Sequence, residues 1–141
     1  MKKTLLILAL GSGLFVSCKK EEPKPSDNTT PMTTTQKIQQ KWNLSSVIDI
    51  EYIGSSTTID NIDTLVLGAP GDYADFRADN KVYISVTGEF DTLPYSIMSD
   101  SKIMFDDQLF DISKLTTSQF EMKFSERIDT PYYDEIINFK R

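Results

Sequence analysis

Histidine is absent from the 141-residue sequence, and cysteine occurs once, at Cys18. Without histidine the chain cannot form a Ser-His-Asp or Cys-His catalytic arrangement or a histidine zinc site, and it lacks the usual general base near neutral pH. A lone cysteine also excludes an internal disulfide. We therefore expect no metal, no cofactor and no catalytic residue. An enzyme would have to work with carboxylates or tyrosines alone, so the sequence favours a protein that is not an enzyme.

Long hydrophobic runs are also missing. The longest apolar stretch spans residues 4–16, which is shorter than the roughly 20 residues of a membrane-spanning helix. Lys2 and Lys3 precede this stretch, and the small residue Ser17 follows it, directly before Cys18. A positive head, a short apolar run and a small residue are typical of a secretory signal. The sequence therefore predicts an exported protein whose residues 1–17 are a signal peptide.

Residues 18–36 contain many Pro, Thr and Ser and almost no large apolar side chains. Such a segment cannot bury enough surface to offset the entropy of ordering it, so we expect a flexible tether. Residues 37–141 are long enough for one small domain. This part contains eighteen Asp or Glu against ten Lys or Arg, without a basic stripe. Nucleic acid is therefore not an expected partner.

Apolar and polar residues alternate along most of the predicted domain. In the long segment that begins at Trp42, the even positions Leu44, Ile48, Ile50 and Tyr52 are apolar or aromatic, which predicts a strand with these side chains facing inward. Turn-forming residues separate the shorter candidates. The eight expected strands are residues 42–53, 73–77, 81–87, 92–98, 102–105, 109–113, 118–128 and 132–140.

The predicted fold is all-β: a small eight-stranded antiparallel up-and-down barrel, since closure pairs the otherwise exposed strand edges. A β-sandwich is the alternative, because the same alternation serves both folds. The long segment 54–72 contains the apolar stretch 64–67. It is interpreted as a lid over the barrel mouth, and a ninth strand that pairs at an edge is nearly as plausible.

Two sets of residues resemble known proteins. Leu14 to Cys18 is similar to the lipobox of bacterial lipoproteins, and the charged residues 19–22 resemble the export tag of Bacteroidota surface lipoproteins. Lys41-Trp42-Asn43-Leu44, a long first strand, a meander of short hairpins and a last strand that ends in Arg resemble the lipocalin-like lipoproteins of Bacteroidota. This second resemblance covers residues 37–141.

The resemblance implies that Cys18 carries the lipid and anchors the protein in the outer membrane, with possible exposure on the cell surface. It also implies a barrel with one closed end, where the guanidinium of Arg141 covers the indole of Trp42. The last strand of an eight-stranded meander ends beside the start of the first, which places these two residues together independently. We expect a monomer that contacts the membrane only through its lipid.

If Trp42 marks the closed end, then Tyr52, Tyr95 and Ile97 lie near the mouth. A hairpin register that aligns the inward apolar rows of the last two strands sets Glu126 opposite Glu135, and both carboxylates then face inward. These five residues are the predicted ligand site for a small hydrophobic or amphipathic molecule. A shift of one residue would turn Glu135 outward. The alternative function is a non-catalytic structural, interaction or inhibitor module whose barrel is filled by its own side chains.

Overall fold

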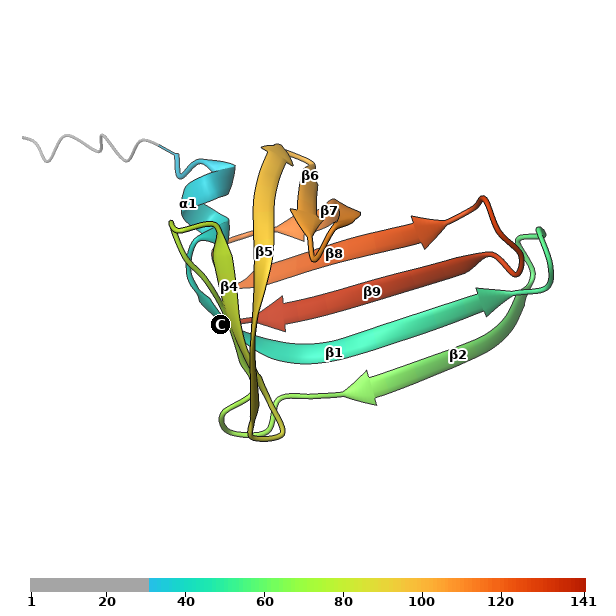
Figure 1. The fold of residues 1–141 in the computed structure, drawn as a ribbon, viewed down its shortest axis with the longest axis horizontal. Coiled ribbons are helices and arrows are strands. Elements are labelled where there is room, and N and C mark those ends of the chain that lie inside the picture. Colours follow the sequence, from blue (N-terminus) through green and yellow to red (C-terminus); the bar gives the residue numbers. More distant parts are fainter. Residues whose placement is uncertain (1–30) are drawn as a thin grey trace, which may run out of the picture. The chain divides into compact units, whose positions relative to one another are not determined.

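The computed structural model describes residues 31–141, which form one compact unit of β-strands with a single short helix (Figure 1). The predicted signal peptide, Cys18 and most of the predicted tether therefore lie outside the described residues. The elements are α1 (Thr34–Ile38), β1 (Lys41–Tyr52), β2 (Ile59–Val66), β3 (Tyr73–Phe76), β4 (Lys81–Val86), β5 (Glu89–Ser99), β6 (Lys102–Phe105), β7 (Gln108–Leu115), β8 (Gln119–Glu126) and β9 (Tyr133–Lys140).

Helix α1 begins at a complete capping box. The Thr33 hydroxyl accepts a bond from the backbone N–H of Gln36, and the Gln36 side chain accepts one from the N–H of Thr33. These two bonds satisfy donors that the first helical turn would otherwise leave without partners. The helix presents Ile38, which is fully buried, to the core.

A closed antiparallel barrel is formed by β1 and β3 to β9, which confirms the predicted fold and excludes the sandwich. Consecutive strands from β3 to β9 pair with their neighbours, and β1 closes the ring by pairing with β3 on one side and with β9 on the other. The turns support this meander: Asn80, Asp106 and Asp107 adopt positive φ angles at strand ends, a conformation that Asn and Asp tolerate better than most residues.

The long segment after β1 is a ninth strand. Residues 59–66 form β2, which pairs with residues 46–52 of β1, so the lid interpretation is wrong and the edge-strand alternative is correct. The reason is the unequal length of the neighbouring strands. Strand β3 covers only residues 41–43 of β1, and the remaining edge of β1 offers backbone groups that β2 satisfies.

The prediction that the even-numbered residues of β1 face inward is correct only for Trp42 and Leu44. The register with β9 shifts between Leu44 and Ser46, so Ser45 is an extra residue in a β-bulge. Trp42 and Leu44 face the core, but beyond the bulge Val47 faces inward and pairs with the buried Ile137. All later even positions of β1 therefore face outward, in contrast to the prediction for Tyr52.

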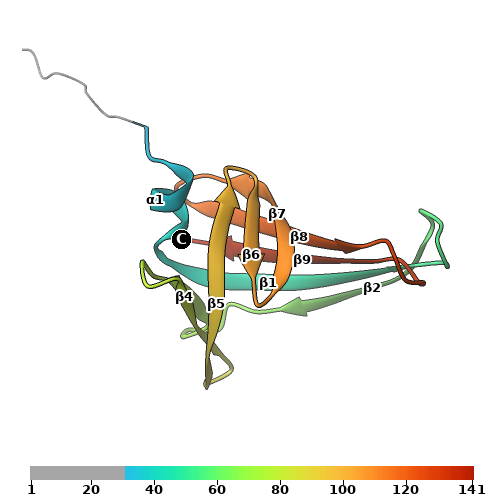
Figure 2. The same ribbon diagram turned by 45° about the horizontal axis from the view of Figure 1, so that its top comes forward.

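Part of the sheet extends beyond the barrel. We call it the projecting sheet: residues 59–66 of β2, 46–52 of β1, 133–138 of β9 and 124–126 of β8. Strand β7 does not pair with residues 124–126 of β8, and β3 does not reach this part of β1. Figures 1 and 2 show these four strands running away from the barrel, with α1 near the opposite end of the domain. The inner face of the projecting sheet is continuous with the interior of the barrel, and its outer face is continuous with the exterior of the barrel.

Candidate binding surfaces

Aromatic rings occupy the barrel interior. The ring of Phe76 lies 5.2 Å from that of Tyr95 and 5.8 Å from that of Phe120, measured between centroids. It also lies 5.9 Å from Phe139 and 6.2 Å from Phe105. Most of these pairs have the edge-to-face geometry that aromatic rings favour. An eight-stranded barrel has an interior that side chains can fill or that can hold one small ligand, and in this barrel the rings pack against one another.

Trp42 closes one end of the barrel. Its side chain is fully buried, its ring lies 5.7 Å from that of Phe120, and its Nε1–H donates to the backbone oxygen of Ile38 at 3.1 Å. The guanidinium carbon of Arg141 lies 5.8 Å from the indole centroid, and the Arg141 side chain also donates to Gln40. The structure therefore places the first and last strands together at this end, with a cation over the indole.

The residues predicted for the mouth are not neighbours in one site. Tyr95 is buried in the core, where its hydroxyl donates to the backbone oxygen of Arg77 at 2.7 Å. Ile97 is half-buried and packs against the same core. Tyr52 lies on the outer face of the projecting sheet and donates to Asp134 at 2.7 Å. The change in facing at the Ser45 bulge explains the misplacement of Tyr52.

Asp134 is the centre of a polar cluster on that outer face. Its side chain is 1% exposed, yet it binds Lys123 Nζ at 2.8 Å and Arg127 Nη2 at 2.5 Å, besides the hydroxyl of Tyr52. Burial alone would raise the pKa of Asp134, but the hydrogen bonds from Lys123, Ser125, Tyr52 and Arg127 together hold this pKa well below its usual value. The cluster therefore keeps a charged carboxylate under the surface, and it joins β1, β8 and β9.

The register of the β8–β9 hairpin differs from the predicted one by two residues. Glu126 lies opposite Tyr133, and Glu135 lies opposite Phe124, so the predicted Glu126–Glu135 pair does not form. A shift of two leaves every side chain on its predicted face, so alternation alone could not distinguish the two registers. Glu126 instead accepts a hydrogen bond from the N–H of Ile128 at 2.7 Å, which lowers its pKa.

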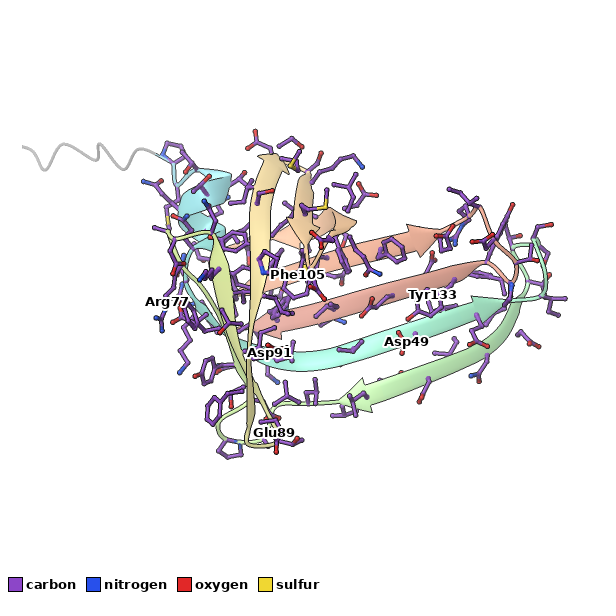
Figure 3. All side chains as sticks on the ribbon, in the orientation of Figure 1. Asp49, Arg77, Glu89, Asp91, Phe105 and Tyr133 are labelled. Atoms are coloured by element: carbon purple, nitrogen blue, oxygen red, sulfur yellow. The ribbon has the colours of Figure 1, made fainter. Side chains whose placement is uncertain are left out.

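Acidic side chains nevertheless meet on the inner face of the projecting sheet. Asp49 of β1 lies opposite Asp63 of β2 on one side and opposite Glu135 of β9 on the other. The Tyr133 hydroxyl donates to Asp49, and Figure 3 labels these two residues on neighbouring strands. Burial and then the charge of Asp49 raise the pKa of Glu135, and burial followed by the bond to Asp49 raises that of Tyr133. These three carboxylates form an acidic row across β2, β1 and β9.

Sequence reasoning identified Glu135 but missed its partners Asp49 and Asp63. The alternation of β1 assigned Asp49 to the outside, and the lid interpretation left Asp63 without a strand. The one available signal was the repeated Asp in the segment Ile59–Val66, where apolar and acidic residues occur close together. It would have indicated an acidic row only after β2 had been paired with β1.

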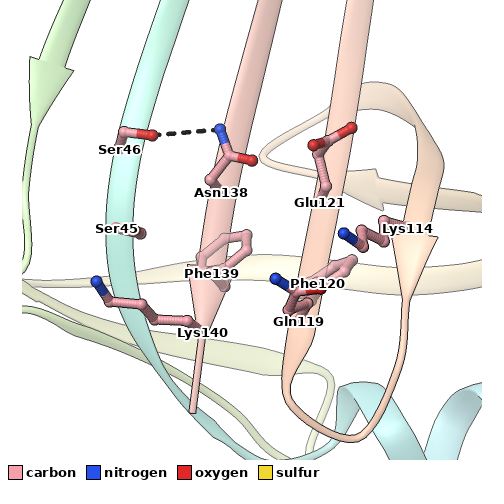
Figure 4. A pocket seen from close by; sticks show the side chains of 9 residues that line it. All are labelled: Ser45, Ser46, Lys114, Gln119, Phe120, Glu121, Asn138, Phe139 and Lys140. Atoms are coloured by element: carbon pink, nitrogen blue, oxygen red, sulfur yellow. Dashed lines mark hydrogen bonds between the residues drawn. The ribbon is translucent and has the colours of Figure 1, made fainter.

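A shallow groove of about 230 Å³ lies on the outer side of β8 and β9 near the barrel (Figure 4). Polar groups from four strands surround it, including the amide of Asn138, which donates to Ser46 Oγ at 3.2 Å. Lys114 and Lys140 stand at its borders, and Glu121 accepts a bond from Ser113 at 2.5 Å. Phe120 and Phe139 also border the groove, but both side chains are buried in the core. The groove is therefore lined mainly by polar groups and differs in character from a site for a hydrophobic guest.

Within residues 31–141, His, Cys, Asp and Glu side chains form no group of three that could hold a metal ion. In the same part of the chain, no helix has the length and apolar character needed to cross a membrane.

Comparison with known proteins does not assign this chain to a family. No protein-family model matches the sequence, and no curated protein matches it at a significant level.

Proposed function

We propose that this protein is a non-catalytic interaction module of the bacterial cell envelope, anchored in the outer membrane through a lipid on Cys18, and that its projecting sheet binds a protein partner. In this proposal the barrel is a scaffold that resembles the lipocalin-like lipoproteins of Bacteroidota.

The observation that carries the proposal is the contrast between the apolar side chains buried in the barrel and those exposed on the projecting sheet. The interior is packed with aromatic side chains, whereas β2 exposes several large aliphatic residues to solvent. Val66 is 78% exposed, Leu65 58% and Ile62 54%. A cluster of exposed apolar side chains beside charged ones is typical of a protein interaction surface.

Site-specific photo-crosslinking in cells tests the binding surface. A photoreactive amino acid at Ile62 or Ile136, both on the outer face of the projecting sheet, is expected to yield an adduct with one envelope protein. The same amino acid at Met98, which is 59% exposed on the barrel strand β5, is the matched control and is expected to yield none. Adducts at Met98 alone, or equal adducts at all three positions, contradict the proposal.

Membrane fractionation tests the anchor. The variant Cys18→Ala is expected to lose its association with membranes, because at least two acyl chains are needed for stable anchoring and this residue would carry them. The neighbouring variant Lys19→Ala keeps the cysteine and is expected to fractionate as the parent does. Retention of Cys18→Ala in the membrane fraction, with normal cleavage of the signal, contradicts the lipoprotein assignment.

A second candidate function is the binding of a small hydrophobic or amphipathic ligand. The observation that favours this second function is an apolar surface on the inner face of the projecting sheet, next to the barrel. Val47 and Phe124 are only partly buried on this surface, and both lie beside Glu135. Such a surface would suit an apolar molecule with a cationic end. Mass spectrometry of an organic-solvent extract of the native protein tests this candidate: a stoichiometric small molecule supports it, and an empty extract together with a crosslinked partner favours the interaction module.

A further inference from the structure

Strand β2 is an open sheet edge. Within residues 31–141 it pairs with β1 alone, at one end of the strand order, and all eight of its residues are exposed. Natural proteins commonly protect such edges with Lys, Pro or a covering segment, because free backbone groups attract other strands. Residues 59–66 contain neither Lys nor Pro, and their only charged residues, Asp60 and Asp63, oppose an acidic strand but not a basic one.

The backbone pairing identifies which groups of β2 are free. The N–H of Leu67 donates to the oxygen of Ser45 at 3.0 Å, and the register then pairs Leu65 with Val47 and Asp63 with Asp49. Hydrogen-bonded residues alternate along an antiparallel strand, so the odd-numbered residues of β2 bond to β1. In the regular part of the strand, the N–H and C=O groups of the even-numbered residues therefore point to the open side; these residues are Ile62, Thr64 and Val66.

The two faces beside this edge differ in chemistry. Ile62 and Val66 present exposed aliphatic side chains on the outer face, next to the half-buried Ile48 and Ile50 of β1. On the inner face Asp63 begins the carboxylate row that continues through Asp49 and Glu135, and Leu65, which is 58% exposed, follows it on the same face. A strand added at this edge would thus meet aliphatic side chains on the outer face, and a negative charge beside one aliphatic side chain on the inner face.

We propose that an extended segment of a partner protein, in which apolar residues alternate with Lys or Arg, adds to β2 as a further strand. This inference deepens the proposed function and rests on it. The backbone groups of Ile62, Thr64 and Val66 bind the main chain of the guest, and the pattern of side chains selects it. Its apolar residues pack on the outer face, and its cations lie beside Asp63 on the inner face.

Charge favours a basic partner over a second copy of this chain. Strand β2 contains two Asp and no Lys or Arg, and acidic residues outnumber basic ones in the whole domain. A second copy that paired through the same edge would bring its own acidic row to the interface. Like charges opposed across strands are destabilising, whereas opposite charges stabilise the pair.

Peptide binding to the full-length protein, solubilised in dodecyl maltoside, tests the inference. The probe is a fluorescent nine-residue peptide that alternates Val and Lys, and the control peptide has the same composition with all Lys residues grouped at one end. Thr64→Pro removes a free N–H without removing a bond to β1, so it is expected to weaken binding of the alternating peptide at least tenfold. Thr64→Val keeps the N–H and is expected to bind as the parent does.

Two further measurements test the two parts of the inference: a charge reversal tests the role of Asp63, and hydrogen exchange distinguishes strand addition from simple attraction of charge. Asp63→Lys is expected to weaken binding of the alternating peptide at least tenfold. Amide hydrogen exchange is independent of any substitution: addition of the peptide is expected to slow exchange at Ile62, Thr64 and Val66. Exchange at Asp63 and Leu65, which already bond to β1, is expected to change little.

Any one of three results overturns the inference. The two peptides bind equally, or Thr64→Pro binds the alternating peptide as tightly as the parent does while its urea midpoint is unchanged, or exchange at the amides of Ile62, Thr64 and Val66 does not change. Self-association of the parent that Thr64→Pro abolishes, measured by sedimentation equilibrium, also overturns it, since the occupant is then a second copy. A crosslinked partner at Ile136 without edge protection refutes strand addition alone and leaves the proposed function intact.

Discussion

Replacement of Trp42 by alanine tests whether the closed end of the barrel determines the stability of the whole domain. The indole is fully buried, contacts the ring of Phe120, lies beneath the guanidinium of Arg141, and donates a hydrogen bond to the backbone of Ile38. Trp42→Ala removes all three interactions and leaves a cavity at the point where β1 and β9 meet.

The expected loss of stability is large compared with the total. Burial of an indole removes about 150 to 250 Å² from water, which corresponds to an upper limit of about 4 to 6 kcal/mol at ~25 cal/mol per Å². Measured losses for Trp or Phe to Ala in protein cores are about 3 to 5 kcal/mol. A domain of this size has a free energy of unfolding of roughly 5 to 15 kcal/mol. Trp42→Ala should therefore leave the domain marginally folded or unfolded.

Urea denaturation followed by far-UV circular dichroism measures this effect, because the variant lacks the only tryptophan and its fluorescence cannot be compared with that of the parent. At an m-value of about 1 to 3 kcal/mol/M, a loss of ~4 kcal/mol lowers the midpoint by about 1.3 to 4 M. Phe90→Ala is the matched control, since Phe90 is 76% exposed and its truncation should not shift the midpoint. Coincident midpoints for Trp42→Ala and the parent would refute the assignment of Trp42 to the core.

The remaining predictions concern acidic residues. The pKa of Asp134 is lower in the folded than in the unfolded state, so this carboxylate stabilises the fold at pH values above its unfolded pKa, and the stabilisation is lost as the pH falls. Asp134→Asn should therefore reduce the drop in urea midpoint between pH 7 and pH 3. An equal drop in the variant and the parent would contradict this prediction. The pKa of Glu135 is raised instead, so its charged form opposes folding and stability is lost as the pH rises through the folded-state pKa. Glu135→Gln should therefore raise the free energy of unfolding at pH 7 by roughly 0.2 to 1 kcal/mol, because it removes a partly buried charge and, with it, a like-charge pair with Asp49. A lower midpoint in the variant would show that the charged Glu135 does not oppose folding.

The strands were predictable because turn chemistry marks their ends. Asp, Asn and Gly residues stand where the chain must adopt positive φ angles, as at Asn80 and Gly88, so the positions of the hairpins follow from local preferences. The barrel followed from the number of strands and from the need to pair their edges. The turns and strand ends depend on residues that are close together in the sequence, so they can be predicted from a single sequence.

The candidate site was less predictable because it depends on register. Ser45 has no property that marks it as a bulge, and Ile48 and Ile50 resume the even-numbered apolar pattern of Trp42 and Leu44 after the single polar residue Ser46. The shift of the β8–β9 hairpin by two residues preserves the face of every side chain, so hydrophobic patterning is equally satisfied by both arrangements. The alternation within each strand therefore could not predict which residues of two neighbouring strands lie opposite each other, such as Asp49 and Glu135.

The bulge at Ser45 is a point where β1 can change length without changing its surface. Ser45 and Ser46 together oppose Asn138, and beyond them Val47, Asp49 and Glu51 face inward. A chain that lacked Ser45 would have a regular strand in which Ser46 alone opposes Asn138, so the same residues would face inward and the acidic row would remain. Deletion of Ile48, by contrast, would exchange the two faces of β1 beyond Val47 and turn Asp49 and Glu51 outward. The same loss of one residue would therefore be silent at the bulge and would invert the recognition surface three positions later.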